Sequence, residues 1–145
     1  MKKVLYNNCY GGFNLSPLAI TEYRKKKGLE TFWYKCKWIH GTLDKEFTKL
    51  DHIPARNNLL EHYATSKDLG KYPKYLSSYA IYYGDFEELR DDKDLIEVVE
   101  DLGLAANGFH ANIKIAEIPC NAPFEIDEYD GFETVVPPRH SWEDF

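Results

Sequence analysis

The stretch KKVLYNNCYGGFNLSPLAITEYRKKKG (residues 2–28) decides how the chain begins to fold. Within it, Val4-Leu5-Tyr6 is typical of a short buried strand, and residues 7–14 form a loop rich in glycine and amide side chains. A strand, a glycine pair and a capped helix in this order leave backbone N–H groups that can meet an anion or a polar ligand. The residues of this loop that we expect to bind a ligand are Asn8, Cys9, Tyr10, Gly11, Gly12 and Phe13.

A helix is predicted directly after the loop. Ser16 is a preferred N-cap, and Pro17 suits the first helical position, where its missing N–H costs nothing. Leu15 and Ile20 have the spacing of a hydrophobic staple across this N-terminus. The helix is expected to end at Gly28, because glycine often follows a helix and the basic residues before it suit the negative end of the helix dipole.

Composition and charge limit the classes of function. The 145 residues, of which 43% are hydrophobic, suffice for a single domain with a buried core. A net charge of −6 argues against binding to nucleic-acid polymers, which requires Lys and Arg to neutralise phosphates. We expect a soluble cytoplasmic protein, because no stretch approaches the roughly 20 apolar residues of a membrane span and no signal peptide is apparent. Cysteines without disulfide or metal spacing agree with a reducing compartment; they are Cys9, Cys36 and Cys120.

The middle of the chain is predicted to contain two strands and a helix. Residues 31–39 are strongly β-prone, residues 42–51 form either a returning strand or a loop, and residues 78–83 are typical of a strand. Between them, residues 53–64 match a helix. The side chains expected to face the core are Phe32, Tyr34, Cys36 and Trp38 of the first strand and Leu59, Leu60 and Tyr63 of the helix.

The clearest helix follows in the third quarter of the chain. Residues 91–102 combine an acidic first turn with apolar residues at helical spacing, and Gly103 offers a stop. Residues 109–116 then alternate with period two, which indicates a strand and places His110 on its polar face.

A hairpin is predicted near the C-terminus, where Asp130-Gly131 is a strong signal for a two-residue turn. It pairs Tyr129 with Phe132 and Ile126 with Val135. Carboxylates at the tip of a hairpin are usually solvated, although paired carboxylates can also serve in acid–base chemistry; those here are Asp127, Glu128, Asp130 and Glu133. Together the elements predict an α+β single domain, with a mostly antiparallel sheet, two or three helices and a C-terminal β-hairpin.

Nucleophilic chemistry has one candidate in the loop. Cys9 precedes a helix N-terminus, where a thiol can have a lowered pKa and attack a substrate if a histidine lies nearby as a base. It can equally line a ligand site or fill a turn as a small buried residue. If the protein is an enzyme, the candidate catalytic residues are His110, His140 and Cys9. We predict neither a metal site nor a cofactor, because no His or Cys pair has ligand spacing.

The C-terminal tail carries a second set of candidate binding residues. In Arg139-His140-Ser141-Trp142, the guanidinium can bind a phosphate in bidentate fashion and the Trp can stack on a flat base. Alternatively the tail is a strap whose Trp fills the core. We expect Arg139, His140 and Trp142 to meet the N-terminal loop around a shared hollow, with His110 and Arg90 completing the ligand site.

Several motifs together resemble a family of small uncharacterised bacteriophage proteins. They are Asn8-Cys9-Tyr10-Gly11-Gly12-Phe13 with Leu15-Ser16, Leu95 to Gly103 with Ala106-Asn107-Gly108, Glu117-Ile118-Pro119, Ile126 to Gly131 with Glu133, and His140 with Trp142. The resemblance covers about half of the chain. It implies a phage protein that acts in the cytoplasm of an infected bacterium, but it implies no particular activity.

Small phage proteins without enzyme motifs include binders that sequester the nucleotide-derived signals of bacterial immunity, commonly as homo-oligomers. The resemblance therefore favours a host-defence antagonist that binds a small nucleotide-like ligand, is a homo-oligomer and contacts no membrane. Aromatic rings to stack a base and a few Arg for phosphates agree with this hypothesis. Two alternatives stay open, a hydrolase or phosphodiesterase that acts on such a nucleotide and a protein–protein inhibitor of a host factor.

Overall fold

The computed structural model describes residues 1–39, 41, 45–55 and 61–138, and its helices and antiparallel strands confirm the α+β class. The strands are β1 (Lys2–Asn7), β2 (Phe32–Trp38), β3 (Lys45–Lys49), β4 (His62–Thr65), β5 (Ala80–Ile81), β6 (Ile113–Ile118), β7 (Glu125–Tyr129) and β8 (Phe132–Val136). The α-helices are α1 (Pro17–Lys26) and α2 (Lys93–Leu102), and short 3₁₀ helices are η1 (Ser77–Tyr79), η2 (Tyr83–Leu89) and η3 (Gly103–Ala106).

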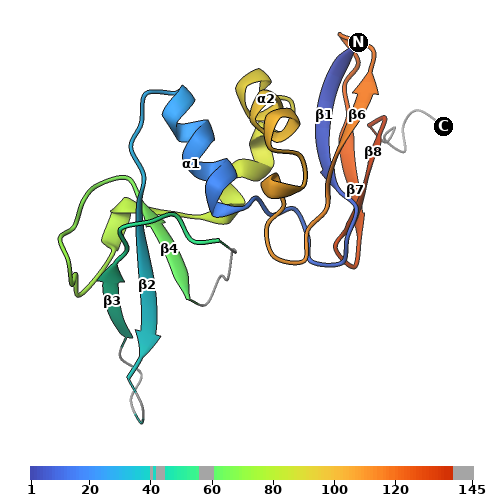
Figure 1. The fold of residues 1–145 in the computed structure, drawn as a ribbon. Helices are drawn as coiled ribbons and strands as arrows, with labels where there is room; N and C mark the ends of the chain where they lie inside the picture. The colour runs from blue at the N-terminus through green and yellow to red at the C-terminus, as the bar shows by residue number, and fades with distance from the viewer. Residues whose placement is uncertain (40, 42–44, 56–60, 139–145) are drawn as a thin grey trace.

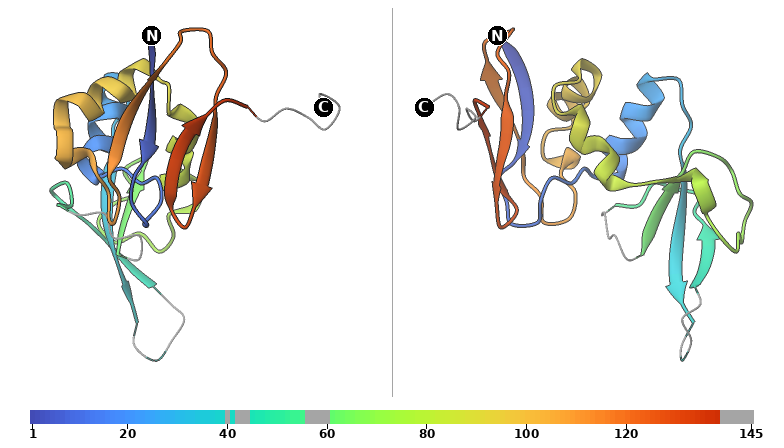
Figure 2. Two further views of the ribbon diagram at one scale, coloured as in Figure 1. Left: turned by 90° about the vertical axis from the view of Figure 1, so that its right-hand side faces the viewer. Right: turned by 180° about the vertical axis from the view of Figure 1, so that it is seen from behind.

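The two α-helices lie between two groups of strands (Figure 1). On one side is a four-stranded sheet in the order β3-β2-β4-β5, and on the other are the pairs β1-β6 and β7-β8. All of these pairings are antiparallel. The further views in Figure 2 agree with this order of layers and show the hairpin β7-β8 beside β1, on the side away from β6.

One cluster of buried hydrophobic side chains connects the layers. It includes Leu5 from β1, Ile20 from α1, Trp33 from β2, Leu95 from α2 and Ile113 from β6. Because the cluster contains residues of both strand groups, the two helices and the strands on either side of them share one hydrophobic core.

Local signals placed the helix α1 and the hairpin correctly. The hydroxyl of Ser16 accepts from the backbone N–H of Ala19 at 3.1 Å, and Gly28 has the left-handed conformation (φ +75°) of a residue that follows a helix. Asp130 and Gly131 both have positive φ (+51° and +88°), as a type I′ turn requires. The predicted pairings across the hairpin, Tyr129 with Phe132 and Ile126 with Val135, are confirmed.

Helix α2 also forms as expected. The side chain of Asp92 caps it by accepting from the N–H groups of Asp94 and Leu95 at 2.9 and 3.1 Å, and its last residue precedes Gly103. The apolar residues that predicted it, Leu95, Val98 and Val99, are buried.

The helix predicted over residues 53–64 is wrong where the structure describes it. His62–Thr65 is strand β4, in which Tyr63 pairs with Tyr34 and its ring packs edge-on against Phe47 at 5.9 Å. Pairing with β2 in the sheet outweighs the local helical pattern, which is a common effect of tertiary structure on a short segment. Leu59 and Leu60 lie outside the described residues.

The core side of β2 was predicted only in part. Tyr34 and Cys36 are buried as expected, but Trp38 is 49% exposed because it lies near the open end of the sheet. Trp33, on the opposite face, is buried against α1, and its indole N–H donates to Thr21 Oγ1 at 2.9 Å. The strand is therefore covered on both faces near its start.

Other boundaries differ from the sequence pattern. Of the two possibilities left open for residues 42–51, the returning strand forms as β3. The strand predicted over 78–83 is reduced to β5 between two 3₁₀ turns, and the strand predicted from 109 begins only at Ile113. His110 therefore lies in a turn before the strand and not on its polar face.

Candidate functional site

Asn7, at the end of β1, holds three segments together from a fully buried position. Its side-chain amide donates to the carbonyls of Cys9 at 2.6 Å and Gly131 at 2.8 Å, and its Oδ1 accepts from the N–H of Asn112 at 2.8 Å. The N-terminal loop, the turn before β6 and the hairpin turn are thus joined by one side chain. Buried amides that are fully bonded fix a geometry, because a lost partner leaves a desolvated polar group.

Glycines allow these segments to approach closely. The N–H of Gly11 donates to the carbonyl of His110 at 3.0 Å, and a Cβ at Gly11 would overlap with that carbonyl. A Cβ at Gly108 would lie 2.7 Å from the carbonyl of Asn14, and one at Gly131 would overlap with the carbonyl of Tyr10. The Gly11-Gly12 pair was predicted to bind a ligand, but Gly11 packs against the turn that contains His110.

Tyr10 and His110 meet at the surface formed by the two loops. The Tyr10 hydroxyl lies 2.6 Å from His110 Nδ1, and the two ring centroids are 4.9 Å apart. Phe109 lies next to them, with its ring centroid 3.9 Å from that of His110. Tyr10 is 57% exposed and Phe109 47%, so two large rings face solvent beside a histidine.

His110 is held in an uncommon backbone conformation. Its φ of +55° lies in the left-handed region, which costs a residue with a side chain about 1 to 2 kcal/mol. The bond from Gly11 and the contact with Tyr10 keep it there. Strained residues of this kind occur often at functional sites, which makes this position a candidate on physical grounds.

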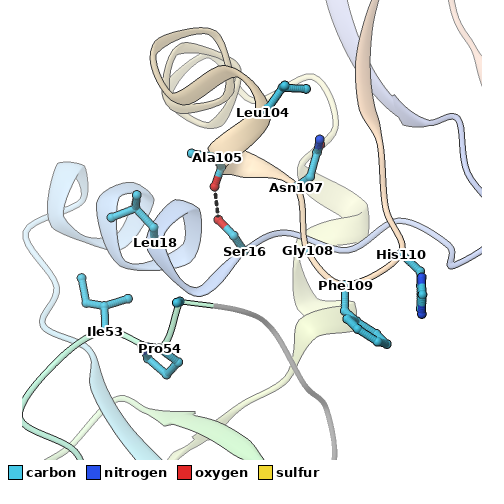
Figure 3. Close-up of a pocket in the computed structure, with 11 residues that line it drawn as sticks. Ser16, Leu18, Ile53, Pro54, Leu104, Ala105, Asn107, Gly108, Phe109 and His110 are labelled. Atoms are coloured by element: carbon cyan, nitrogen blue, oxygen red, sulfur yellow. Dashed lines mark hydrogen bonds between the residues drawn. The ribbon is translucent and has the colours of Figure 1, made fainter.

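A cavity of about 530 Å³ adjoins this surface (Figure 3). Phe109 and His110 line one side, α1 contributes Leu18, and Ile53 and Pro54 lie opposite. The described residues that line it include no Asp, Glu, Lys or Arg, although the chain is acidic overall. A flat, uncharged group fits such a lining better than an ionic one.

The floor of the cavity is fixed by the N-terminus of α1. Ser16 Oγ donates to the carbonyl of Ala105 at 2.6 Å while it caps the helix, and its N–H donates to the carbonyl of Ala106 at 2.9 Å. Helix α1 and the 3₁₀ turn η3 are therefore locked together beneath the two loops.

Arg90 and Phe13, both predicted to bind ligand, lie in the interior. Arg90 is 7% exposed, and its guanidinium forms a bidentate ion pair with Glu133 at 2.6 and 2.8 Å. The guanidinium carbon Cζ of Arg90 also lies 4.1 Å from the centre of the Phe13 ring. Glu133, expected to be solvated at a hairpin tip, is 8% exposed and also accepts from the N–H of Asn7 at 2.8 Å. This group is built for structure, and we leave Arg90 and Phe13 out of the proposed site.

The remaining predicted residues divide between the loop and the tail. Asn8 is exposed, and Cys9 and Gly12 are partly exposed beside Tyr10. No hydrogen bond joins the Cys9 thiol to a histidine within the described part of the chain, and its role as a nucleophile stays a prediction. Arg139, His140 and Trp142 lie outside the described residues, and their meeting with the loop stays a prediction.

Sequence reasoning missed two contributors to this site. Phe109 was assigned to the apolar face of a strand, and Asn7 was treated as one amide of a loop. The signal available for Phe109 was Asn107-Gly108 directly before it, since that dipeptide favours a turn and a turn exposes the residues that follow. The role of Asn7 had no local signal, because the partners of its side chain lie up to 124 residues away.

Comparisons with protein-family models, with curated proteins and with solved structures found no match for this chain. Within the described ranges, no helix is long and apolar enough to cross a membrane. No group of three or more metal-ligating side chains occurs among the same residues.

Proposed function

We propose that this protein binds and sequesters a small nucleotide-derived ligand at the surface of Tyr10, Phe109 and His110. The observation that carries the proposal is the gathering of these three rings beside the cavity, on loops that are fixed by buried hydrogen bonds. An exposed aromatic ring on a rigid support can stack a base at a reduced ordering cost. The family resemblance favours a phage protein and a signal of host immunity as the ligand.

The parts of the ligand are assigned by chemistry. The base lies against Phe109 and the uncharged cavity wall, where Asn107 supplies a polar edge. For the phosphates, the partners predicted from the sequence are Arg139 and His140. Sequestration requires no turnover, and binding alone lowers the free concentration of the signal.

A second candidate function is hydrolysis of the same ligand, and the bond between Tyr10 and His110 favours it. In the imidazolium form of His110, Nδ1–H donates to the Tyr10 oxygen, and the proton on Nε2 can be transferred to a leaving group, which leaves a neutral imidazole. This assignment makes His110 the general acid and Tyr10 its positioning residue.

One experiment separates the two functions. The purified protein is incubated with mononucleotides, cyclic mononucleotides and cyclic dinucleotides, washed, heated, and the released material is analysed by chromatography. Intact ligand supports sequestration, and products that disappear in His110→Ala support hydrolysis. Because a hydrolase releases its products, the wash is analysed as well, and the absence of both retained ligand and products contradicts both functions and favours the inhibitor of a host protein.

Variants test the site itself. Phe109→Ala is expected to weaken binding about 5- to 150-fold, because a stacked base contributes about 1 to 3 kcal/mol. Tyr129→Ala is the matched control, since that ring is 85% exposed on the hairpin and away from the cavity lining. Equal affinity of the two variants would move the site elsewhere. Arg139→Ala and Trp142→Ala test the tail in the same assay.

A further inference from the structure

Charge is divided unequally along the chain. Residues 31–82, which contain β2 to β5, have eight Lys and Arg against five Asp and Glu, a net charge of +3. The rest of the chain has ten against nineteen, a net charge of −9. The charge of the whole chain, which argued against nucleic acids, is therefore an average over two regions of opposite sign.

A wide groove lies on the basic region, between strand β3 and residues 72–77. Its volume is about 1110 Å³, and Lys45, Phe47, Tyr72, Lys74 and Tyr75 are among the residues that line it. Tyr72 is 73% exposed and Tyr75 69%, although both are large rings. None of the described residues that line this groove lines the cavity beside Phe109, so the two sites are separate.

Lysines accompany the exposed rings of this region. The ammonium of Lys45 lies 4.4 Å from the centre of a Trp38 ring, and that of Lys74 lies 5.6 Å from the Tyr75 ring. Rings beside cations provide both contacts that a single nucleic-acid strand needs, a face on which to stack a base and a charge for the adjacent phosphate. The groove contributes one carboxylate, Glu46, among its described lining residues.

We propose that the groove between β3 and residues 72–77 binds single-stranded nucleic acid. Bases stack on Tyr72 and Tyr75, and Lys45 and Lys74 contact the phosphates between them. The contacts use the flat faces of bases and the backbone, so binding depends little on sequence.

An extended acidic peptide is the competing occupant. The N–H of Leu50 donates to the carbonyl of Trp33 at 2.8 Å, so the backbone of Leu50 faces β2. In an antiparallel pair every second residue faces the partner strand, and the backbone N–H and C=O of Phe47 therefore point away from β2. A peptide could add beside Phe47 as a short strand, although the N–H of Lys49 on the same edge already donates to the carbonyl of Lys71 at 2.8 Å. The aromatic rings favour the nucleic acid, because strand addition uses the backbone and leaves Tyr72 and Tyr75 without a specific role.

Fluorescence anisotropy with a labelled twelve-residue oligothymidylate tests the proposal on the full chain. Affinity is expected to fall as NaCl rises from 25 to 200 mM, because bound counterions are released from the phosphates. The double variant Tyr72→Ala/Tyr75→Ala is expected to bind at least tenfold more weakly. Lys45→Gln/Lys74→Gln is expected to reduce the slope of log affinity against log salt by about 1.4, or about 0.7 for each phosphate contact.

Matched controls keep the result decisive. Tyr129→Ala and Lys114→Gln change an exposed ring and an exposed lysine outside the groove, and both are expected to bind as the parent does. The groove and the cavity beside Phe109 share no described lining residue, so failure of the nucleotide proposal would not affect this one. Absence of binding at 25 mM NaCl, or equal loss in groove and control variants, overturns the proposal. So does binding of an oligoglutamate peptide alone.

Discussion

Strands β1 and β8 meet around polar atoms, whereas the four-stranded sheet is packed with aromatic rings. Where β1 meets β8, the buried polar side chains are those of Asn7, Arg90 and Glu133, and each residue is hydrogen bonded. In the sheet, Tyr34 and Trp33 are buried on opposite faces of β2. The first region carries the proposed nucleotide site, and the second carries the groove.

The difference teaches how each region supports a binding surface. Directional hydrogen bonds specify one arrangement of the loops around Tyr10 and His110, and such bonds are costly to leave unmade. Aromatic packing is less directional and holds a sheet while its edge stays open to solvent. Substitutions in the first region should therefore cost far more stability than comparable ones in the second.

The largest effect is expected from Glu133→Gln, which leaves the guanidinium of Arg90 buried without a charged partner. Removing one partner from a buried ion pair typically costs about 3 to 5 kcal/mol in the free energy of unfolding. Urea denaturation monitored by circular dichroism measures it. Asp68→Asn is the counterpart in the sheet region, where the pair with Lys49 is solvated, and its effect should be too small to resolve.

Replacing both charges distinguishes the role of this pair. Arg90→Met/Glu133→Leu removes the desolvated charges together, and it should recover part of the stability lost in the single variant. A single variant as stable as the parent would show that water reaches the pair, and the contrast between the two regions would then be invalid.

A pair of glycines gives the next largest difference. Gly131 and Gly70 have almost the same positive φ, +88° and +89°, so alanine pays a similar backbone cost of about 1 to 2 kcal/mol at each. A Cβ at Gly131 would also overlap with the carbonyl of Tyr10, while nothing lies within 4 Å of one at Gly70. Gly131→Ala should therefore lose clearly more unfolding free energy than Gly70→Ala. Equal losses would mean that the turn and the loop separate easily.

The same contrast explains which features the sequence predicted. Helix α1, helix α2 and the hairpin were found from caps, periodicity and a turn dipeptide, because each signal lies within the element that it specifies. Strand β4 was missed because its conformation depends on pairing with β2, about 30 residues earlier in the chain. Local patterns cannot report a distant partner.

The candidate site shows the same limit. Tyr10 and His110 were both assigned to the ligand site, but the direct contact of their side chains spans 100 residues and no pattern predicted it. Glu133 was misjudged because its burial depends on Arg90, which lies 43 residues away. Residue types could be selected from the sequence, whereas their assembly required the fold.

A smaller effect is expected at alkaline pH in the sheet region. Burial raises the pKa of Tyr83 well above its usual value, and its hydroxyl donates to the carbonyl of His62 at 3.2 Å. Because the pKa is higher in the folded state, the contribution of Tyr83 to the free energy of unfolding is fully present below the unfolded pKa near 10. Above that pH the free energy of unfolding falls by about 1.4 kcal/mol for each pH unit. Tyr83→Phe should flatten the fall in stability between pH 10 and 11.5, measured by urea denaturation. An unchanged slope would place the loss on other groups.

The smallest effect, and the one that should be equal in both regions, concerns surface ion pairs. Lys3 with Glu100 at 2.9 Å lies beside the polar contact, and Lys49 with Asp68 at 2.6 Å lies on the sheet, each with side chains about a third to a half exposed. Solvent screens both pairs in the same way, whatever the packing beneath them. Double-mutant cycles for the two pairs should give similar small couplings at 10 mM NaCl that vanish at 0.5 M. A coupling at Lys3 and Glu100 that survives high salt would show that the hydrogen-bonded network between β1 and β8 also fixes the ion pair at its surface.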